Sequence, residues 1–229
     1  MPLFRQQDAS GLVLPVETRT TAIDGDYVFM IDASTNIPYR ITKANLLAGL
    51  SSGGSGGSNV SLNYVSDGDT NGLFYYLGSS KKTTAWVNPS GGGVIISASS
   101  TESGVLSSLT DRASSEWFSN INANNWVQFQ LVSCKLQCSK YSIKTRANNV
   151  DYYPRNWQLQ GSNDGTTWDV IDSQVNNTAL NSVSQWLTLS VTSTTAYSYF
   201  RILQNGNDSS GTGYLCLGEV ELYGTYSPQ

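Results

Sequence analysis

The chain contains no histidine in 229 residues. This absence excludes Ser-His-Asp and Cys-His nucleophilic catalysis, histidine-ligated zinc and the commonest general base. Cysteine is also scarce, with only Cys134, Cys138 and Cys216. A CxxxC pair without histidine has too few ligands for a zinc site. We therefore expect buried free thiols, in preference to a Cys134–Cys138 or a Cys138–Cys216 disulfide.

Charge and long apolar runs are scarce too. Only 13% of residues are charged, and the formal net charge is -4, which argues against a nucleic-acid partner because phosphate binding needs a concentrated basic face. No segment approaches the roughly eighteen apolar residues of a membrane span, and the start "MPLFRQQDASG" lacks the apolar run of a secretory signal peptide. We expect a protein without membrane insertion that stays in the cytoplasm or leaves it by a route needing no signal.

A run of serine and glycine, "SSGGSGGS" at residues 51–58, is typical of a flexible tether. It separates an N-terminal segment, residues 1–50, from a larger domain, residues 59–229. In the first segment "DGDYVFMID" predicts a short buried strand over 27–31, and "YRITKANLLAGL" predicts one or two helical turns over 44–48 between a Thr42 N-cap and a Gly49 C-cap. One strand and one short helix bury too little surface to stand alone, so we expect this segment to assemble with copies of itself or with another protein.

Residues 59–229 read as short strands separated by turn signals. In "NWVQFQL", Val127, Phe129 and Leu131 alternate with glutamines, which gives one dry and one wetter face. With no long helix between them and roughly ten-residue spacing, these segments predict an all-β antiparallel sandwich or jelly roll. The expected strands are "GLFYYLG", "GVIISAS", "NWVQFQLV", "CSKYSIKTR", "RNWQLQGS", "TWDVIDS", "QWLTLSV", "SYFRILQ" and "GEVELYG".

Two stretches, "NWQLQGSNDGTTWDVID" and "YFRILQNGNDSSGTGYLCLGEVELYG", resemble the coagulation factor 5/8 type C domain, also called the discoidin domain. Upstream, "VIISASSTESGVLSSLTDRASSEWFSNINANNWVQFQL" is similar to the family's opening, and "NGLFYYLGSSKKTTAWVNP" resembles an extra hairpin found ahead of that core in some members. The resemblance covers about 73–224. It implies a galactose-binding-like β-sandwich that binds glycans, phospholipids or proteins and does not catalyse a reaction.

Some of these residues have structural roles of their own. Residues 163–165, Asn-Asp-Gly, tolerate the positive φ of a tight hairpin, and Trp168 lies where it can cover the sheet. Arg201 lies on an otherwise apolar strand, so its guanidinium needs an acceptor. We expect Glu219 or Glu221 of the closing strand to supply it.

The resemblance places the ligand site on three loops at one end of the sandwich: "SEWFSNINANN", "TRANNVDYYPR" and "QNGNDSSGTGY". Aromatic rings stack on the C–H faces of sugars, and Asp, Asn and Arg engage pairs of hydroxyl groups, so these loops favour a glycan. The alternative is that Arg155 and Asp151 pair to brace the middle loop while its tyrosines pack inward. The candidate ligand-binding residues are Trp117, Phe118, Arg146, Asn149, Asp151, Tyr152, Tyr153, Arg155, Asn207 and Tyr214.

Other activities of these loops are disfavoured. Membrane binding requires several protruding apolar side chains and a basic collar, whereas Trp117 and Phe118 are the only bulky apolar pair in the first loop. A glycoside hydrolase needs paired carboxylates, and Asp151 is the only acid in the middle loop. We therefore assign no catalytic residue and expect a protein that is not an enzyme.

A calcium site is weakly indicated. The stretch "DGDTNG", residues 67–72, matches the first half of an EF-hand loop, but the twelfth position is Gly78 where a bidentate Glu belongs. A turn rich in Asp and Asn is the better interpretation. The resemblance also allows a calcium ion near Asp111, as in some sugar-binding relatives, so we expect no metal or cofactor but leave calcium open.

The stretch "DGDYVFMIDASTNIPYRITKANLLAGL" resembles N-terminal segments of tailed-phage fibre and other virion proteins. This implies that residues 1–50 attach to other virion proteins and form a homotrimer. We therefore predict a non-enzymatic phage virion protein, a tail fibre or capsid decoration, whose discoidin domain binds a host surface polysaccharide. The alternatives are a cellular discoidin protein-interaction module and a purely structural virion protein.

Overall fold

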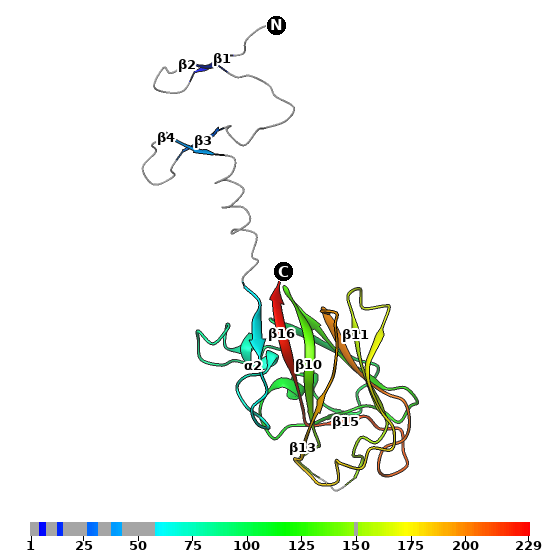
Figure 1. The fold of residues 1–229 in the computed structure, drawn as a ribbon. Helices are drawn as coiled ribbons and strands as arrows, with labels where there is room; N and C mark the ends of the chain where they lie inside the picture. The colour runs from blue at the N-terminus through cyan, green and yellow to red at the C-terminus, as the bar shows by residue number, and fades with distance from the viewer. Residues whose placement is uncertain (1–4, 8–12, 16–26, 32–37, 43–57, 149–150) are drawn as a thin grey trace. The chain divides into compact units, whose positions relative to one another are not determined.

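The computed structural model describes residues 5–7, 13–15, 27–31, 38–42, 58–148 and 151–229. The chain divides into two compact units, Met1–Gly56 and Gly57–Gln229. Figure 1 shows the described elements along the chain. Among the described residues, no helix has the length and apolar character needed to cross a bilayer.

The first unit contains two antiparallel hairpins. β1 (Arg5–Gln7) pairs with β2 (Val13–Pro15), and β3 (Tyr27–Ile31) pairs with β4 (Pro38–Thr42). The predicted strand over 27–31 is confirmed, whereas the other three strands were not predicted. The predicted helical turns over 44–48 and residues 51–57 of the predicted tether lie outside the described residues.

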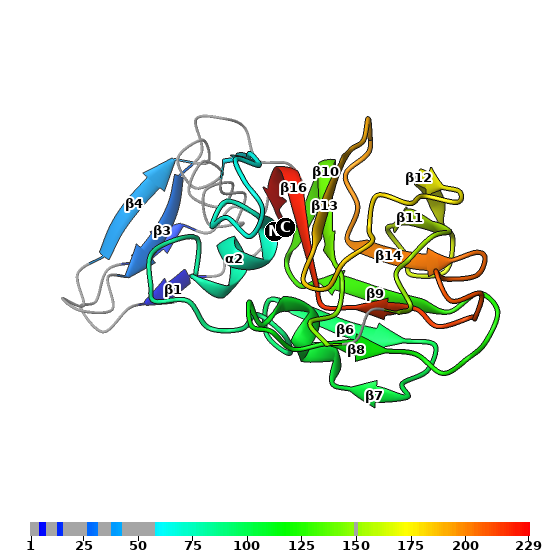
Figure 2. The ribbon, with the colours of Figure 1, turned by 90° about the horizontal axis from the view of Figure 1, so that it is seen from below.

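The second unit is an antiparallel β-sandwich, as the sequence predicts. In its four-stranded sheet the strand order is β13 (Trp186–Ser190), β10 (Cys134–Lys144), β16 (Glu219–Pro228) and β5 (Val60–Leu62). In its five-stranded sheet the order is β12 (Asp169–Gln174), β11 (Trp157–Ser162), β14 (Tyr199–Gln204), β9 (Trp126–Leu131) and β6 (Val94–Ala98). Figure 2 shows the unit turned by 90°.

A smaller three-stranded sheet consists of β15 (Cys216–Leu217), β8 (Trp117–Phe118) and β7 (Ser103–Gly104), and a 3-10 helix, η1 (Leu106–Thr110), precedes β8. The core is formed by every second side chain along the strands, those that point into the sandwich. On β9 these are Val127, Phe129 and Leu131, all at most 3% exposed, as their alternation with glutamine predicts. Trp117 and Trp157 are fully buried in the same core.

The segment "GLFYYLG" is a helix, α2 (Leu73–Gly78), and neither the predicted strand nor the predicted extra hairpin is correct. The helical conformation of this segment is stabilised by a residue of a distant strand. The carboxylate of Glu221, from β16, accepts hydrogen bonds from the backbone N–H groups of Phe74 at 2.8 Å and Tyr75 at 3.2 Å. These are amides that the first turn of a helix leaves without partners. A cap supplied from a distant strand leaves no local signal in the sequence.

Arg201 does not pair with Glu219 or Glu221. Its Nε donates to Oε1 of Gln160 at 2.6 Å, and its guanidinium lies 4.2 Å from the ring centroid of Trp168. The two glutamates are occupied elsewhere: Glu219 pairs with Lys144 at 2.9 Å, and Glu221 caps α2. Burial lowers the pKa of Arg201 from its usual value. The neutral glutamine and the aromatic ring replace the expected ion pair.

The predicted hairpin at residues 163–165 is confirmed. It joins β11 to β12, and Gly165 adopts φ +72°, which favours glycine. The carboxylate of Asp164 accepts hydrogen bonds from the backbone N–H groups of Thr166 and Thr167 at 2.8 and 2.7 Å, and these bonds lower the pKa of Asp164. Asparagine, aspartate and glycine therefore act here as turn residues.

The three cysteines are buried and free, as predicted. Burial in the core raises the pKa of Cys134 to about 11 and the pKa of Cys138 and Cys216 to about 12. At neutral pH all three are therefore thiols with low reactivity.

Candidate functional site

The three predicted loops lie at one end of the sandwich, where β10 and β14 end and β9, β11 and β16 begin. This is the lower end of the unit in Figure 1, and Figure 2 views the unit from that side. The C-terminal residues lie at the opposite end, where Tyr226 pairs with Val60. We call residues 115–125, 145–155 and 204–214 the first, middle and third loops; residues 149–150 of the middle loop lie outside the described residues.

A buried asparagine joins the first and third loops. Asn125 is 1% exposed, and its Nδ2 donates to the carbonyl oxygens of Asn120 and Asn122 in the first loop and of Gly213 in the third, at 2.8 to 3.1 Å. Its Oδ1 accepts a hydrogen bond from Oγ of Ser99 at 3.0 Å. Because a buried amide holds its partners in fixed directions, the two loops are fixed relative to each other. Sequence reasoning missed this role, since asparagine in a loop also signals an ordinary turn.

The third loop is fixed in a similar way. Asp208 is 5% exposed, and its Oδ1 accepts hydrogen bonds from the backbone N–H groups of Ser210 at 2.8 Å and Thr212 at 3.1 Å. Ser209 in turn contacts the middle loop, because its Oγ accepts a hydrogen bond from the backbone N–H of Tyr153 at 2.9 Å. All three loops are therefore connected by hydrogen bonds.

An open hollow of about 400 Å³ lies between the first and third loops. Gly213 is needed at its wall, because a Cβ there would lie 2.8 Å from the carbonyl oxygen of Asn122. The lining carries no charged side chain, and of the predicted ligand-binding residues only Asn207 belongs to it. The lining residues are Ile121, Asn122, Ala123, Asn124, Asn205, Gly206, Asn207 and Gly213.

An aromatic cluster is formed by Phe118, Tyr152 and Tyr214, one residue from each loop, and Tyr214 directly follows Gly213 of the wall of the hollow. The ring centroids of Tyr152 and Tyr214 are 4.8 Å apart, and those of Phe118 and Tyr214 are 5.9 Å apart. All three residues are half-buried. The structure thus brings three of the predicted residues together in the predicted place.

Arg146 lies next to this cluster, and one terminal nitrogen of its guanidinium is paired with Glu116, whereas its buried Nε has no hydrogen-bond partner among the described residues. Arg146 is 6% exposed, donates to Oε1 of Glu116 at 2.9 Å, and lies 5.1 Å from the ring centroid of Phe118. Burial alone would lower the pKa of Arg146, but the hydrogen bond and charge of Glu116 raise it above the usual value. Arg146 is therefore a buried cation, and its predicted contact with a ligand stays a prediction.

Arg155 and Tyr153 also brace the middle loop. Arg155 donates to the carbonyl oxygens of Asn177, at 3.1 Å, and Leu180, and it lies 6.0 Å from the ring centroid of Tyr153. Tyr153 is only 5% exposed. Tyr153 packs inward as the alternative interpretation expects, but Arg155 donates to backbone carbonyls and not to Asp151.

Three predicted residues remain: one is buried, one is exposed and one lies outside the described residues. Trp117 is fully buried, and its Nε1 donates to Oγ1 of Thr101 at 2.9 Å, so it is a core residue and its predicted ligand contact is corrected. Asp151 is exposed at the loop surface. Asn149 lies outside the described residues.

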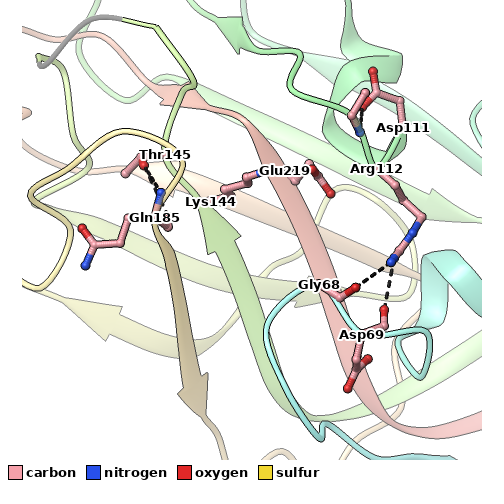
Figure 3. Close-up of polar contacts among 9 residues, drawn as sticks. Gly68, Asp69, Asp111, Arg112, Lys144, Thr145, Gln185 and Glu219 are labelled. Carbon is pink, nitrogen blue, oxygen red and sulfur yellow. Dashed lines mark hydrogen bonds and ion pairs between the residues drawn. The ribbon is translucent and has the colours of Figure 1, made fainter.

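A second polar group lies near this end and is shown in Figure 3. Arg112 donates to the carbonyl oxygens of Gly68 at 2.6 Å and Asp69 at 3.1 Å, and Lys144 donates to Glu219 at 2.9 Å. Beneath them Glu221 borders a cavity of about 10 Å³, which is room for about one water molecule. The charges in this group are therefore paired or bonded to backbone.

Burial raises the pKa of Glu221 to about 7. The backbone N–H groups of Phe74, Tyr75 and Leu222, which donate to its carboxylate, act in the opposite direction but do not outweigh burial. Glu221 is 5% exposed and belongs to the fold, because it caps α2. It is nevertheless a group that titrates near neutral pH.

The calcium sites considered from the sequence contain carboxylates that bond to the protein backbone. Asp69 accepts hydrogen bonds from the backbone N–H groups of Val65 at 2.7 Å and Asn71 at 2.8 Å, and these bonds help lower its pKa against the opposing effect of burial. Asp111 accepts from Ala113 at 2.8 Å. Within the part of the chain that the structure describes, no group of three or more acidic, cysteine or histidine side chains is placed to hold a metal. The expectation of no metal, with calcium left open, stays a prediction.

Curated proteins match most of this chain. It is 32% identical over 168 residues to the E3 ubiquitin-protein ligase Ufd4 of Drosophila melanogaster, and 30% identical over 176 residues to the E3 ubiquitin-protein ligase hecd-1 of Caenorhabditis elegans. It is 26% identical over 180 residues to the BTB/POZ domain-containing protein At2g30600 of Arabidopsis thaliana. These alignments cover 69%, 73% and 72% of this chain, but only 6%, 7% and 22% of the relatives.

Solved structures with a similar chain path include two from Clostridium perfringens. CpGH89CBM32-5, in complex with GalNAc-β-1,3-galactose, is 14% identical with a TM-score of 0.49, covering 58% of this chain and 96% of that one. The family 32 CBM of NanJ, in complex with galactose, is 14% identical with a TM-score of 0.48, covering 57% and 93%.

The family assignment comes from the sequence. The sequence profile of the F5/8 type C domain matches residues 95–217, which is more than half of the chain. These residues run from β6 to β15 and include all three loops. The chain therefore belongs to the F5/8 type C, or discoidin, domain family.

Proposed function

We propose that this protein is a non-enzymatic binding module that recognises a glycan at the loop end of its sandwich. The observation that carries the proposal is the open hollow between the first and third loops, with exposed asparagines on its walls and the aromatic cluster beside it. Each asparagine amide offers a donor and an acceptor, which suits the hydroxyl groups of a sugar. Each partly exposed ring offers a face for the C–H surface of a sugar.

Two further points support binding over catalysis. F5/8 type C domains are binding modules, and the profile match includes the loops that form the hollow. The chain also has no histidine, so the most frequent catalytic bases and nucleophile pairs are excluded. We therefore assign Asn207, Tyr152, Tyr214 and Phe118 to ligand contact, and no residue to catalysis.

A glycan array followed by titration calorimetry tests this proposal. Asn207→Ala and Tyr214→Ala should each weaken the best array ligand by about tenfold or more, since each removes a hydrogen bond or a stacking contact. Asn59→Ala removes an exposed amide away from the loops and should leave binding unchanged. The proposal fails if no glycan binds, or if both loop variants bind as well as the wild type while retaining its melting temperature.

A cellular protein-interaction module is the second candidate. The observation that favours it is the similarity to two E3 ubiquitin-protein ligases and a BTB/POZ domain-containing protein. In this case the glycan array is negative, and a protein partner identified by cross-linking should lose contact with both Asn207→Ala and Tyr214→Ala. A partner that cross-links equally to both variants would place the interface outside the hollow.

The placement in a virion and the homotrimer remain proposals for residues 1–50. They are supported by the sequence pattern around "DGDYVFMID" and by the small size of the β3–β4 hairpin. The curated relatives described above come from an insect, a nematode and a plant and lend the virion role no support. Light scattering should show a trimer for the full chain and a monomer for a chain that starts at Asn59. A monomer in both cases contradicts the attachment model, and a purely structural virion protein would trimerise without binding any glycan.

A further inference from the structure

We propose that the loop-end site takes uncharged glycans, and that Glu116 sets this preference by neutralising the cation nearest to the site. The inference rests on the proposed glycan binding and adds the class of sugar. It follows from the partners of the charged side chains in the three loops. By sequence these loops contain few ionisable acids and only two cations: Glu116, Arg146, Asp151, Arg155 and Asp208.

The first cation, Arg146, is the one nearest to the aromatic cluster. Its guanidinium lies 5.1 Å from the ring centroid of Phe118 and 5.8 Å from that of Tyr152. One of its terminal nitrogens donates to Glu116 at 2.9 Å, and the whole side chain is 6% exposed. A carboxylate on a ligand would have to displace Glu116 from a partly buried ion pair to reach this charge.

The second cation, Arg155, is half-buried and uses one terminal nitrogen of its guanidinium, Nη1, within the protein. It donates to the carbonyl oxygens of Asn177 and Leu180, on the chain segment between β12 and β13. These bonds hold two loop segments together, and an anionic ligand would have to break them. Each arginine therefore already has a partner within the protein, with which an anionic ligand must compete.

The acids of the loops add to this effect. Asp208 is buried and accepts hydrogen bonds from Ser210 and Thr212, whereas Asp151 is exposed. An exposed carboxylate on the middle loop disfavours the approach of an anionic sugar. The hollow itself has only amide, small and aliphatic side chains on its walls. A neutral glycan satisfies such walls without an ion partner.

Glu116 is the positioning residue of this arrangement. Besides the bond to Arg146, its Oε2 accepts from the backbone N–H of Asn148 at 3.4 Å, so it connects the first and middle loops. Its side chain is 19% exposed, so it is more accessible than that of Arg146. When its carboxylate becomes an amide, the positive charge of Arg146 loses its compensation, and an anionic group on the ligand can supply it.

The test compares array glycans in pairs that differ only by a terminal carboxylated sugar, at low and high salt. The wild type should prefer the neutral member of each pair, with binding that does not change with salt. Glu116→Gln should gain about tenfold for the carboxylated member at low salt and lose that gain at high salt. Glu102→Gln removes an exposed carboxylate outside the three loops and should keep the wild-type preference.

The outcomes separate the two proposals. If the wild type binds the carboxylated members as well as the neutral ones, or more tightly at low salt than at high salt, the inference is overturned while glycan binding at the loops stands. If no glycan binds, the proposed function fails and takes the inference with it. If Glu116→Gln does not fold, as judged by its melting temperature, the preference and salt independence of the wild type decide the matter alone.

Discussion

Glu221 gives this fold a pH-dependent stability that can be measured without interference from histidine. The pKa of Glu221 in the folded protein is about 7, against an ordinary value of 4.5, because burial penalises its charged form. Between these two pH values the folded state holds a proton that the unfolded state has released. The contribution of Glu221 to the free energy of unfolding is therefore fully present below about pH 4.5 and is lost as the pH rises through about 7.

The expected magnitude follows from the same two values. At about 1.4 kcal/mol per pKa unit, the difference between 4.5 and about 7 corresponds to a total loss of about 3 kcal/mol. Most of it, about 2 to 3 kcal/mol, falls between about pH 5 and pH 8. Burial also raises the pKa of Glu219, so that residue contributes with the same sign. The chain has no histidine, and the cysteine pKa values lie at about 11 to 12, so neither group titrates in this window.

Urea denaturation followed by tryptophan fluorescence is a suitable assay. All six tryptophans belong to the second unit, so the signal reports the sandwich alone. The free energy of unfolding of the wild type should decrease across this pH range. Glu221→Gln cannot ionise and should remove most of the slope, whereas Glu102→Gln should retain it. A flat wild-type profile, or a slope that survives in Glu221→Gln, would refute the reasoning.

Three further predictions concern particular residues of the sandwich. Trp117→Ala should lower the free energy of unfolding by about 3 to 5 kcal/mol in urea titrations, as for other buried aromatic residues; a loss below about 1 kcal/mol would contradict its place in the core. Cys134, Cys138 and Cys216 should not react with a thiol reagent in the native protein and should all react in urea, and fast native labelling would argue against their burial. Gly165→Ala should cost about 1 kcal/mol because the residue adopts φ +72°; an unchanged melting temperature would show that the hairpin relaxes.

Much of the sandwich could be predicted from its sequence, because the alternation of apolar and polar residues along a strand shows which of its side chains are buried. Val127, Phe129 and Leu131 alternate with glutamines, and the structure places them on the inward face of β9. The Asn-Asp-Gly turn is equally local, since its conformation depends on the backbone freedom of those residues. The all-β class and the positions of β9 to β14 and of β16 follow from such local signals, whereas the two-residue strands β7, β8 and β15 were not predicted.

Elements held by distant partners could not be predicted. The segment 73–78 has aromatic residues typical of a strand, yet it is helical because Glu221, far along the chain, caps its first turn. In the same way Arg201 was expected to pair with an acid, but the register of β11 with β14 places Gln160 directly opposite it. Pairing between distant strands decides both cases.

The candidate site shows the same division. The resemblance to the discoidin family implies which loops meet, the sequence shows which aromatic residues they carry, and Phe118, Tyr152 and Tyr214 do form a cluster. The sequence does not indicate whether an arginine faces the solvent or the protein. Arg146 and Arg155 have partners in Glu116 and in backbone carbonyls from other segments, so both brace the loops.

The central claim is that the hollow beside the aromatic cluster binds a glycan. Titration calorimetry of the best array glycan against the wild type and Asn207→Ala tests it most directly. The account predicts saturable binding by the wild type and a loss of affinity of about tenfold or more in Asn207→Ala, with Asn59→Ala unchanged. Equal affinity in all three proteins, at equal melting temperatures, would contradict it.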